Sequence, residues 1–157
     1  MSELIIGWKE WVSLPDLNIP AIKAKVDTGA RTSALHASRI TTLEEASEPW
    51  VQFVVQPLRK HPEIEIQCAS KLLDRRDIKD SGGHVETRYV IETAVTLGDR
   101  TWPVALSLTD RGDMLFRMLL GRTAFEGAAI IHPGRKYLTG KARLSKHYPG
   151  LEKGGSR

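Results

Sequence analysis

The sequence has one cysteine, Cys68, among its 157 residues, and it contains no long apolar run. A single cysteine excludes an internal disulfide, and chains without disulfides are typical of reducing compartments, so we expect a cytoplasmic protein. Residues 1–9 include an acid, Glu3, and lack the apolar stretch of a signal peptide or of a membrane-spanning helix. The sequence therefore predicts no association with a membrane.

Two strings that identify nucleotide and zinc chemistry are also missing. A P-loop requires Gly-x-x-x-x-Gly-Lys-Ser/Thr and a zincin requires His-Glu-x-x-His on a helix, and neither string occurs. The five histidines are scattered, and no two of them lie four residues apart. We therefore expect no metal and no cofactor. A zinc site assembled in space from His36, His61, Cys68 or His84 stays open as the alternative.

The rest of the composition is that of a globular protein, and its charge is uneven. The length suits one domain, with 41% hydrophobic and 27% charged residues. Residues 133–157 carry a net charge of +6, against +4 for the whole chain. We expect a folded domain over residues 1–140 and a basic, flexible tail over 141–157. Such a tail either attracts an acidic partner (RNA, a ribosomal surface or an acidic peptide) or is a plain solvated terminus.

The periodicity of the chain is mostly that of strands. Apolar and polar residues alternate from 85 to 97, a turn is expected at Gly98-Asp99, and the alternation resumes over 102–108, which predicts a β-hairpin. Shorter strand-like runs lie near 5–12, 19–26, 50–55 and 63–67, and one short helix is expected after Gly121, at about 123–127. The pattern predicts an all-β fold with a small barrel or sandwich-like core.

A highly charged stretch, 71–83, interrupts the strand pattern and ends in two glycines. It lies between two predicted strands, as the tip of a long hairpin would. Two interpretations stay open: a covering loop over a site, or an exposed loop without a role.

The most informative segment is Asp27-Thr28-Gly29-Ala30, which directly follows an apolar strand. The strand would present the acid at a rigid end, and the glycine permits a tight turn close to a ligand. The three residues Asp-Thr-Gly also occur in ordinary turns, since Asp and Gly favour them. The motif alone therefore does not decide between a turn and a site.

A second motif, Leu120-Gly121-Arg122, follows about 90 residues later, again after apolar residues. With the first motif and the β-rich region between them, this layout resembles the retropepsin-like aspartic peptidases. Residues 25–37 and 118–123 are similar to one bacterial subfamily, commonly labelled ATP-dependent zinc proteases and linked with the ligase that adds glutamates to a ribosomal protein. The resemblance covers residues 4–140 and implies a small closed barrel with one lobe per chain.

The resemblance implies an aspartic peptidase, in which water is activated between two carboxylates that share a proton. The chain has one such motif, since 110–113 lacks the hydroxyl residue and the apolar strand. The implied enzyme is a homodimer with Asp27 and its symmetry mate on the twofold axis. Thr28 would hold the loops together across that axis. The implied substrate-binding residues are Thr28, Gly29, Ala30, Arg31 and Arg122.

Arg31 departs from the wider family pattern, in which this position is commonly an acid that pairs with the later arginine. We expect one of two arrangements: Arg31 and Arg122 form an anion site for glutamate-rich or glutamylated protein tails, or Glu126 or an acid across the dimer neutralises Arg122. The implied partners are an acidic peptide or protein, a ribosomal protein or the glutamate ligase. The alternative functions are a silent, retropepsin-shaped binding module and a ribosome- or RNA-associated protein acting through its basic tail.

Overall fold

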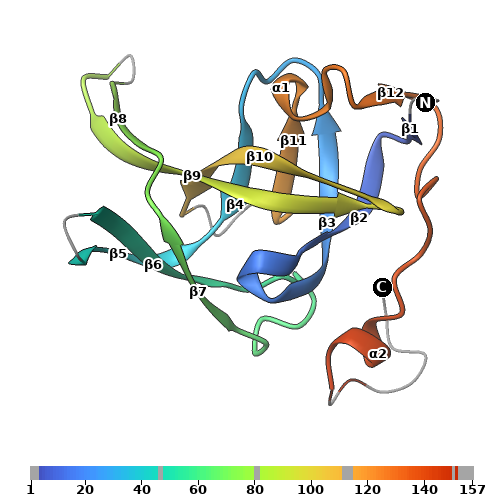
Figure 1. The fold of residues 1–157 in the computed structure, drawn as a ribbon, viewed down its shortest axis with the longest axis horizontal. Coiled ribbons are helices and arrows are strands. Elements are labelled where there is room, and N and C mark those ends of the chain that lie inside the picture. Colours follow the sequence, from blue (N-terminus) through green and yellow to red (C-terminus); the bar gives the residue numbers. More distant parts are fainter. Residues whose placement is uncertain (1–3, 46–47, 80–81, 111–114, 150, 152–157) are drawn as a thin grey trace.

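The computed structural model describes residues 4–45, 48–79, 82–110, 115–149 and 151 of the chain, and strands dominate it (Figure 1). The strands are β1 (Leu4–Ile6), β2 (Lys9–Leu14), β3 (Ile19–Asp27), β4 (Ser33–His36), β5 (Ser38–Glu45), β6 (Glu48–Val55), β7 (Ile66–Lys71), β8 (Asp74–Lys79), β9 (Val85–Leu97), β10 (Arg100–Thr109), β11 (Met118–Gly121) and β12 (Ala129–Ile131). The helical elements are η1 (Pro15–Leu17), α1 (Arg122–Phe125) and α2 (Leu144–His147). No helix among the described residues is long and apolar enough to span a membrane.

Six strands close into a barrel. Their order is β10-β4-β11-β3-β2-β9, and β9 returns to pair with β10. Strand β8 pairs only with β9 in this sheet, β5-β6-β7 form a separate three-stranded sheet, and β1 pairs with β12 in parallel. The main apolar core fills the barrel, where residues such as Leu35, Ile91 and Leu106 are fully buried. The predicted all-β fold with a small closed barrel is confirmed.

The β9–β10 hairpin forms as its alternation predicts. β9 spans Val85–Leu97, and Gly98 adopts a φ of 62° in the turn. This left-handed conformation favours glycine, because a side chain would be strained there. The short helix after Gly121 is also present, although it begins at Arg122 rather than near residue 123.

The expected opening strand over residues 5–12 is instead two strands, β1 and β2, separated at Gly7. The chain near Arg135 crosses directly over this glycine: the Trp8 N–H donates to Arg135 O at 2.7 Å. A Cβ on Gly7 would lie 2.6 Å from the Cα of Lys136, so no side chain fits. The crossing by a distant segment, which no local pattern signals, breaks the strand. The expected run at 63–67 is likewise displaced, since β7 begins only at Ile66.

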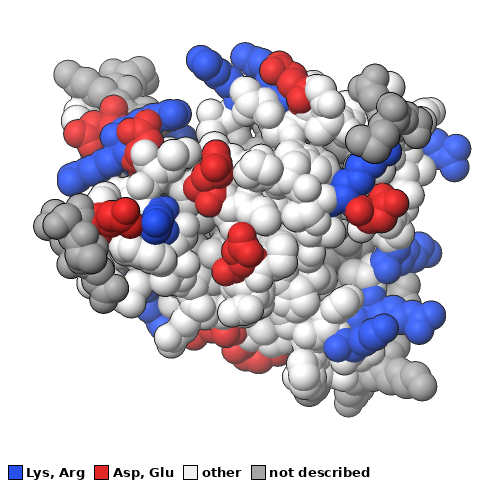
Figure 2. All heavy atoms as spheres, in the orientation of Figure 1, with Lys and Arg blue, Asp and Glu red and all other residues white. Residues whose placement is uncertain are grey.

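The segment after residue 140 packs against the barrel over its first part. Ala142, Leu144 and Tyr148 join Ala21 and Leu58 in a second apolar cluster, and the Tyr148 hydroxyl donates to the backbone oxygen of Ala21. This part is therefore not a free tail. Residues 152–157 of the expected tail lie outside the described residues. Figure 2 shows basic side chains gathered on the side of the molecule where this segment runs.

Much of the charged stretch 71–83 is strand rather than loop. Residues 74–79 form β8 and pair with 85–90 of β9, so the two strands make a hairpin that projects from the barrel (Figure 1). The stretch thus ends at a hairpin tip, as expected. A covering role for that tip stays a prediction.

Candidate active site

Asp27 is the last residue of β3, and the turn that follows holds its side chain. Gly29 N–H donates to Asp27 Oδ1 at 3.1 Å, and Ala30 N–H donates to the Asp27 backbone oxygen at 3.2 Å. The structure gives the carboxylate no ion pair and no other hydrogen bond within the described residues. Asp27 is half-buried. Strand β3 therefore ends in a half-buried carboxylate that one backbone N–H orients and that has no ion pair among the described residues.

The second motif lies directly beside the first. β11 pairs with β3 in parallel and places Gly121 opposite Asp27. Arg122 N–H donates to Ala30 O at 2.8 Å, and Gly121 N–H donates to the buried hydroxyl oxygen of Ser33 at 3.0 Å. These bonds join two segments separated by about 90 residues into one loop cluster, as the resemblance implied.

Gly121 is required by this close approach. A Cβ at this position would lie 2.7 Å from the carbonyl carbon of Thr32 and 2.9 Å from Ala30 O, both of them backbone atoms. Thr123 tightens the same contact, because its hydroxyl donates to Arg31 O at 2.7 Å. Sequence reasoning did not single out Ser33 or Thr123 as positioning residues. Their hydroxyl side chains within the two motifs were the available signal.

The backbones of Arg31 and Arg122 are brought together, and their side chains carry no acid partner among the described residues. The Arg122 Nη1–H donates weakly to Gly29 O at 3.4 Å, and both side chains are exposed. The Glu126 backbone N–H donates to Arg122 O at 3.1 Å. The Glu126 carboxylate, which was one candidate to neutralise Arg122, forms no ion pair in the described part of the chain. An anion site at these two arginines stays a prediction.

Thr28 and Ala30 lie in the same turn. Thr28 is exposed and Ala30 is half-buried, which leaves Thr28 free to contact a second chain. Of the region 110–113, only Asp110 is described, and it follows β10 rather than an Asp-Thr-Gly turn. Residues 111–113 lie outside the described residues.

The β1–β12 sheet carries an apolar edge near the end of the barrel that holds Asp27. Ile5 and Ile130 are register partners and are 54% and 51% exposed. Figure 1 shows β1, β12, α1 and the arrowhead of β3 toward the same upper edge of the molecule. Two large apolar side chains are therefore left in water on strands that lie toward this end of the molecule.

The histidines and the cysteine are not gathered into a metal site. His36 is buried, and burial together with the nearby Arg117 guanidinium holds its pKa below the ordinary value. Burial raises the pKa of the Cys68 thiol to about 12, and the thiol contacts the backbone oxygens of Leu17 and Ile66, each at 3.6 Å. His61 pairs with Glu63 at 3.5 Å. The described residues contain no group of three or more His, Cys, Asp or Glu side chains that could hold a metal ion.

Comparison with known proteins identifies a matching family model and several curated relatives. Residues 5–142 match the RimB-like family, described as retropepsin-like aspartic endopeptidase RimB. A probable alpha-L-glutamate ligase of Shewanella halifaxensis is 44% identical over 140 residues, covering 89% of this chain and 31% of the relative. One of Desulfotalea psychrophila is 44% identical over 160 residues, covering 99% of this chain and 34% of the relative. The chain thus spans about a third of the length of these curated relatives.

A solved structure is also similar. A protein of unknown function from Legionella pneumophila superposes with a TM-score of 0.74 at 28% sequence identity. The match covers 88% of this chain and 99% of the Legionella chain. The barrel described above is therefore similar to a solved structure over nearly all of that structure's length.

Proposed function

Since the chain belongs to the RimB-like family of retropepsin-like aspartic endopeptidases, we propose that it hydrolyses peptide bonds with water activated between two Asp27 carboxylates of a homodimer. The observation that carries this proposal is the Asp27 turn. At the end of β3 it presents a carboxylate that has no ion pair among the described residues, and the Arg122 N–H holds the turn by donating to Ala30 O. A carboxylate held this way matches the role that the chemistry requires.

The mechanism needs two such groups at close range. Two like charges that lie together cannot both ionise, so the pair shares one proton. The ionised carboxylate accepts a proton from water, and the protonated carboxylate donates to the oxygen of the scissile carbonyl. Each chain supplies one Asp-Thr-Gly turn, so the second carboxylate comes from Asp27 of a second copy.

The exposed β1–β12 edge supports the dimer. Ile5 and Ile130 would leave water if a second copy covered this edge, and such burial stabilises association by roughly 25 cal/mol per Å² of apolar surface. The edge lies toward the same end of the molecule as Asp27 (Figure 1). One interface can therefore both bury the isoleucines and bring two Asp27 side chains together.

We propose glutamate-rich or glutamylated protein tails as the substrate class, with a tail on a ribosomal protein as one example. The curated relatives are named as glutamate ligases, and each is a longer protein with a segment that matches this chain. Arg31 and Arg122 supply exposed guanidinium groups beside the Asp27 turn, and guanidinium groups bind carboxylates through paired hydrogen bonds. A glutamate ligase is the proposed functional partner, and the cytoplasm is the proposed location.

The test compares wild type with Asp27→Asn in the cleavage of a glutamate-extended peptide, with sedimentation of both proteins. We expect a dimer in each case and loss of turnover only in Asp27→Asn, because the amide keeps the shape and cannot share the proton. Asp16→Asn is the matched control, since Asp16 is exposed on η1. Substantial cleavage by Asp27→Asn, or by a monomeric wild type, would contradict the proposal.

A further inference from the structure

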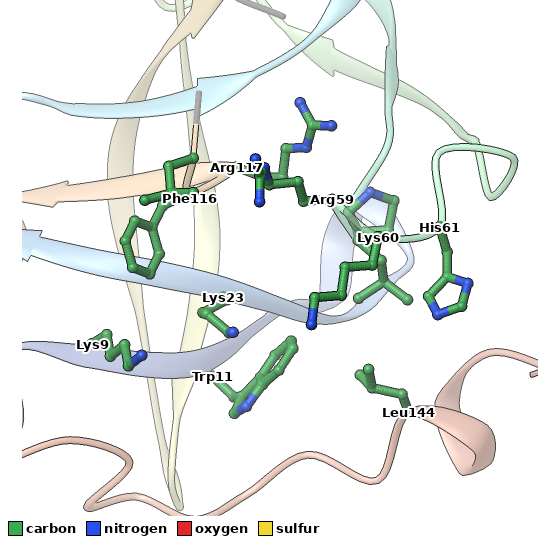
Figure 3. Close-up of a pocket in the computed structure, with 12 residues that line it drawn as sticks. Lys9, Trp11, Lys23, Arg59, Lys60, His61, Phe116, Arg117 and Leu144 are labelled. Carbon is green, nitrogen blue, oxygen red and sulfur yellow. The ribbon is translucent and has the colours of Figure 1, made fainter. Parts of the chain in front are cut away.

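A basic cavity lies away from the Asp27 turn, on the outer face of β2 and β3 (Figure 3). It has a volume of about 230 Å³, and five of its lining residues are Lys or Arg: Lys9, Lys23, Arg59, Lys60 and Arg117. None of the described lining residues is acidic. These residues come from four separated segments of the chain, so the cavity has no signature in the sequence.

Arg117 is the most unusual residue of this cavity. It is only 8% exposed, and its Nε and Nη1 atoms are buried with no hydrogen-bond partner among the described residues. Burial lowers its pKa, and the neighbouring Arg59 lowers it further. A buried charge is normally paired, since an uncompensated one is costly. Among the described residues, no acid compensates this buried guanidinium.

The other cations of the cavity are also without acid partners in the described part of the chain. Lys9 and Lys23 are held by aromatic rings instead: Lys9 Nζ lies 4.8 Å from the Trp8 ring centroid, and Lys23 Nζ lies 5.3 Å from that of Trp11. Such contacts orient an ammonium group and leave its positive charge uncancelled. Among the described residues, the five cations therefore combine into one positive field, and the only acid paired with a lining residue is Glu63, at His61.

We propose that this cavity is a second binding site, which takes the side-chain carboxylates of an acidic peptide. Figure 3 shows Arg59 and Arg117 close together and Lys9 and Lys23 apart from them, a spread that suits several carboxylates better than one phosphate. Trp11, Phe116 and Leu144 give the lining apolar surface, against which the methylene groups of glutamate side chains can pack.

The cavity is connected to Asp27 by one face of β3. Side chains two residues apart in a strand share a face, so Lys23, Lys25 and Asp27 form a row on β3. Lys23 lies roughly 13 Å from Asp27 along the strand, at ~3.3 Å per residue. A bound extended peptide would place an acidic residue about four positions from the cleaved bond. This placement rests on the proposed peptidase function, whereas the binding itself does not.

The test measures binding of a fluorescent pentaglutamate peptide by anisotropy in the Asp27→Asn background, so that cleavage does not interfere. Further substitution of Arg117→Met or Lys23→Gln should weaken binding about tenfold or more, because each removes a charge-assisted contact. Lys136→Gln, an exposed lysine outside the cavity, should change binding less than twofold. Lys23→Gln changes a half-buried lysine, so it tests the cavity independently of any change in packing at Arg117.

Three comparison probes distinguish a site for acidic peptides from a site for uncharged peptides, for phosphate or for RNA. Pentaglutamine should bind at least tenfold more weakly than pentaglutamate. Inorganic phosphate should compete only at concentrations far above those of the peptide. A ten-nucleotide RNA should bind more weakly than pentaglutamate at equal salt. Equal binding of pentaglutamine, stronger binding of RNA or phosphate, or an equal effect of Lys136→Gln would overturn the proposal.

The two proposals fail in different ways. If wild type cleaves no peptide while the cavity variants still lose pentaglutamate binding, the proposed function fails and the second site stands. If wild type cleaves peptides and the cavity variants bind pentaglutamate as tightly as their parent does, the second site fails and the peptidase stands.

Discussion

Replacing Arg117 with Met should make the protein more stable, although it removes a buried polar residue. Met keeps an unbranched, flexible side chain in the space of the arginine stem and has no charge to compensate. The buried Nε and Nη1 of Arg117 lack partners among the described residues. Buried ion pairs can be replaced by apolar residues without loss, and here the guanidinium has no acid partner among the described residues.

The expected gain in the free energy of unfolding follows from the buried Nε and Nη1 atoms of Arg117. An unsatisfied buried polar group costs about 1–3 kcal/mol, so the two together set an upper limit of roughly 2–6 kcal/mol. Arg117 is 8% exposed, and Met does not reproduce all of its packing, so we expect about half of that limit, roughly 1–3 kcal/mol. A gain of about 1–3 kcal/mol corresponds to a rise in Tm of roughly 3–9 °C for a domain of this size.

Urea denaturation at pH 7.5, followed by tryptophan fluorescence, measures the change. Arg117→Lys is the matched control, because it keeps a positive charge in the same place and should bring no gain. Arg135→Met changes an exposed arginine and should leave the free energy of unfolding within 0.5 kcal/mol or so of wild type. A loss of more than about 1 kcal/mol in Arg117→Met would show that the guanidinium is compensated in solution, and would refute the reasoning.

The same substitution has a pH signature at His36. Burial first, then Arg117, lower the pKa of His36 below 6.5, against a smaller opposing effect of Asp110 and a hydrogen bond with Thr109 O. The unfolded chain therefore takes up this proton first, and wild type loses stability as the pH falls below 6.5 toward the lower folded pKa. In Arg117→Met the folded pKa should move upward, which reduces that loss. Titration of the His36 ring by NMR measures the shift, and an unchanged pKa would contradict the contact.

Three other substitutions test the framework around the site. Glu10→Gln should destabilise the fold by about 2–5 kcal/mol in urea denaturation. The buried carboxylate accepts four hydrogen bonds, with a backbone N–H on each oxygen, and an amide must turn its NH₂ toward one of those donors. A loss of stability below about 1 kcal/mol would contradict this. Gly121→Ala should abolish peptide cleavage with the far-UV circular dichroism retained, since the new Cβ would meet Thr32 backbone at 2.7 Å; wild-type turnover would count against the loop contact. Arg31→Asp should reduce cleavage of glutamate-rich peptides far more than that of neutral ones, and equal effects on both would remove the anion site.

The sequence by itself determined the local elements of this protein. The alternation over residues 85–97 and the glycine at 98 predicted β9 and its turn, because both depend on neighbours within a few residues. The apolar run before Asp27 likewise predicted a strand that ends at the acid. The resemblance carried by the two motifs added the closed barrel and the pairing of the motifs.

Only the tertiary structure decided where distant segments meet. The break at Gly7 depends on the crossing near Arg135, and Leu144 and Tyr148 are buried because they contact Ala21 and its neighbours, more than 120 positions away. The basic cavity depends in the same way on segments that share no periodicity. Sequence patterns indicate the face of a strand on which a side chain lies. The desolvation of a charged side chain depends instead on every segment that packs around that side chain, and this packing exists only in the folded chain.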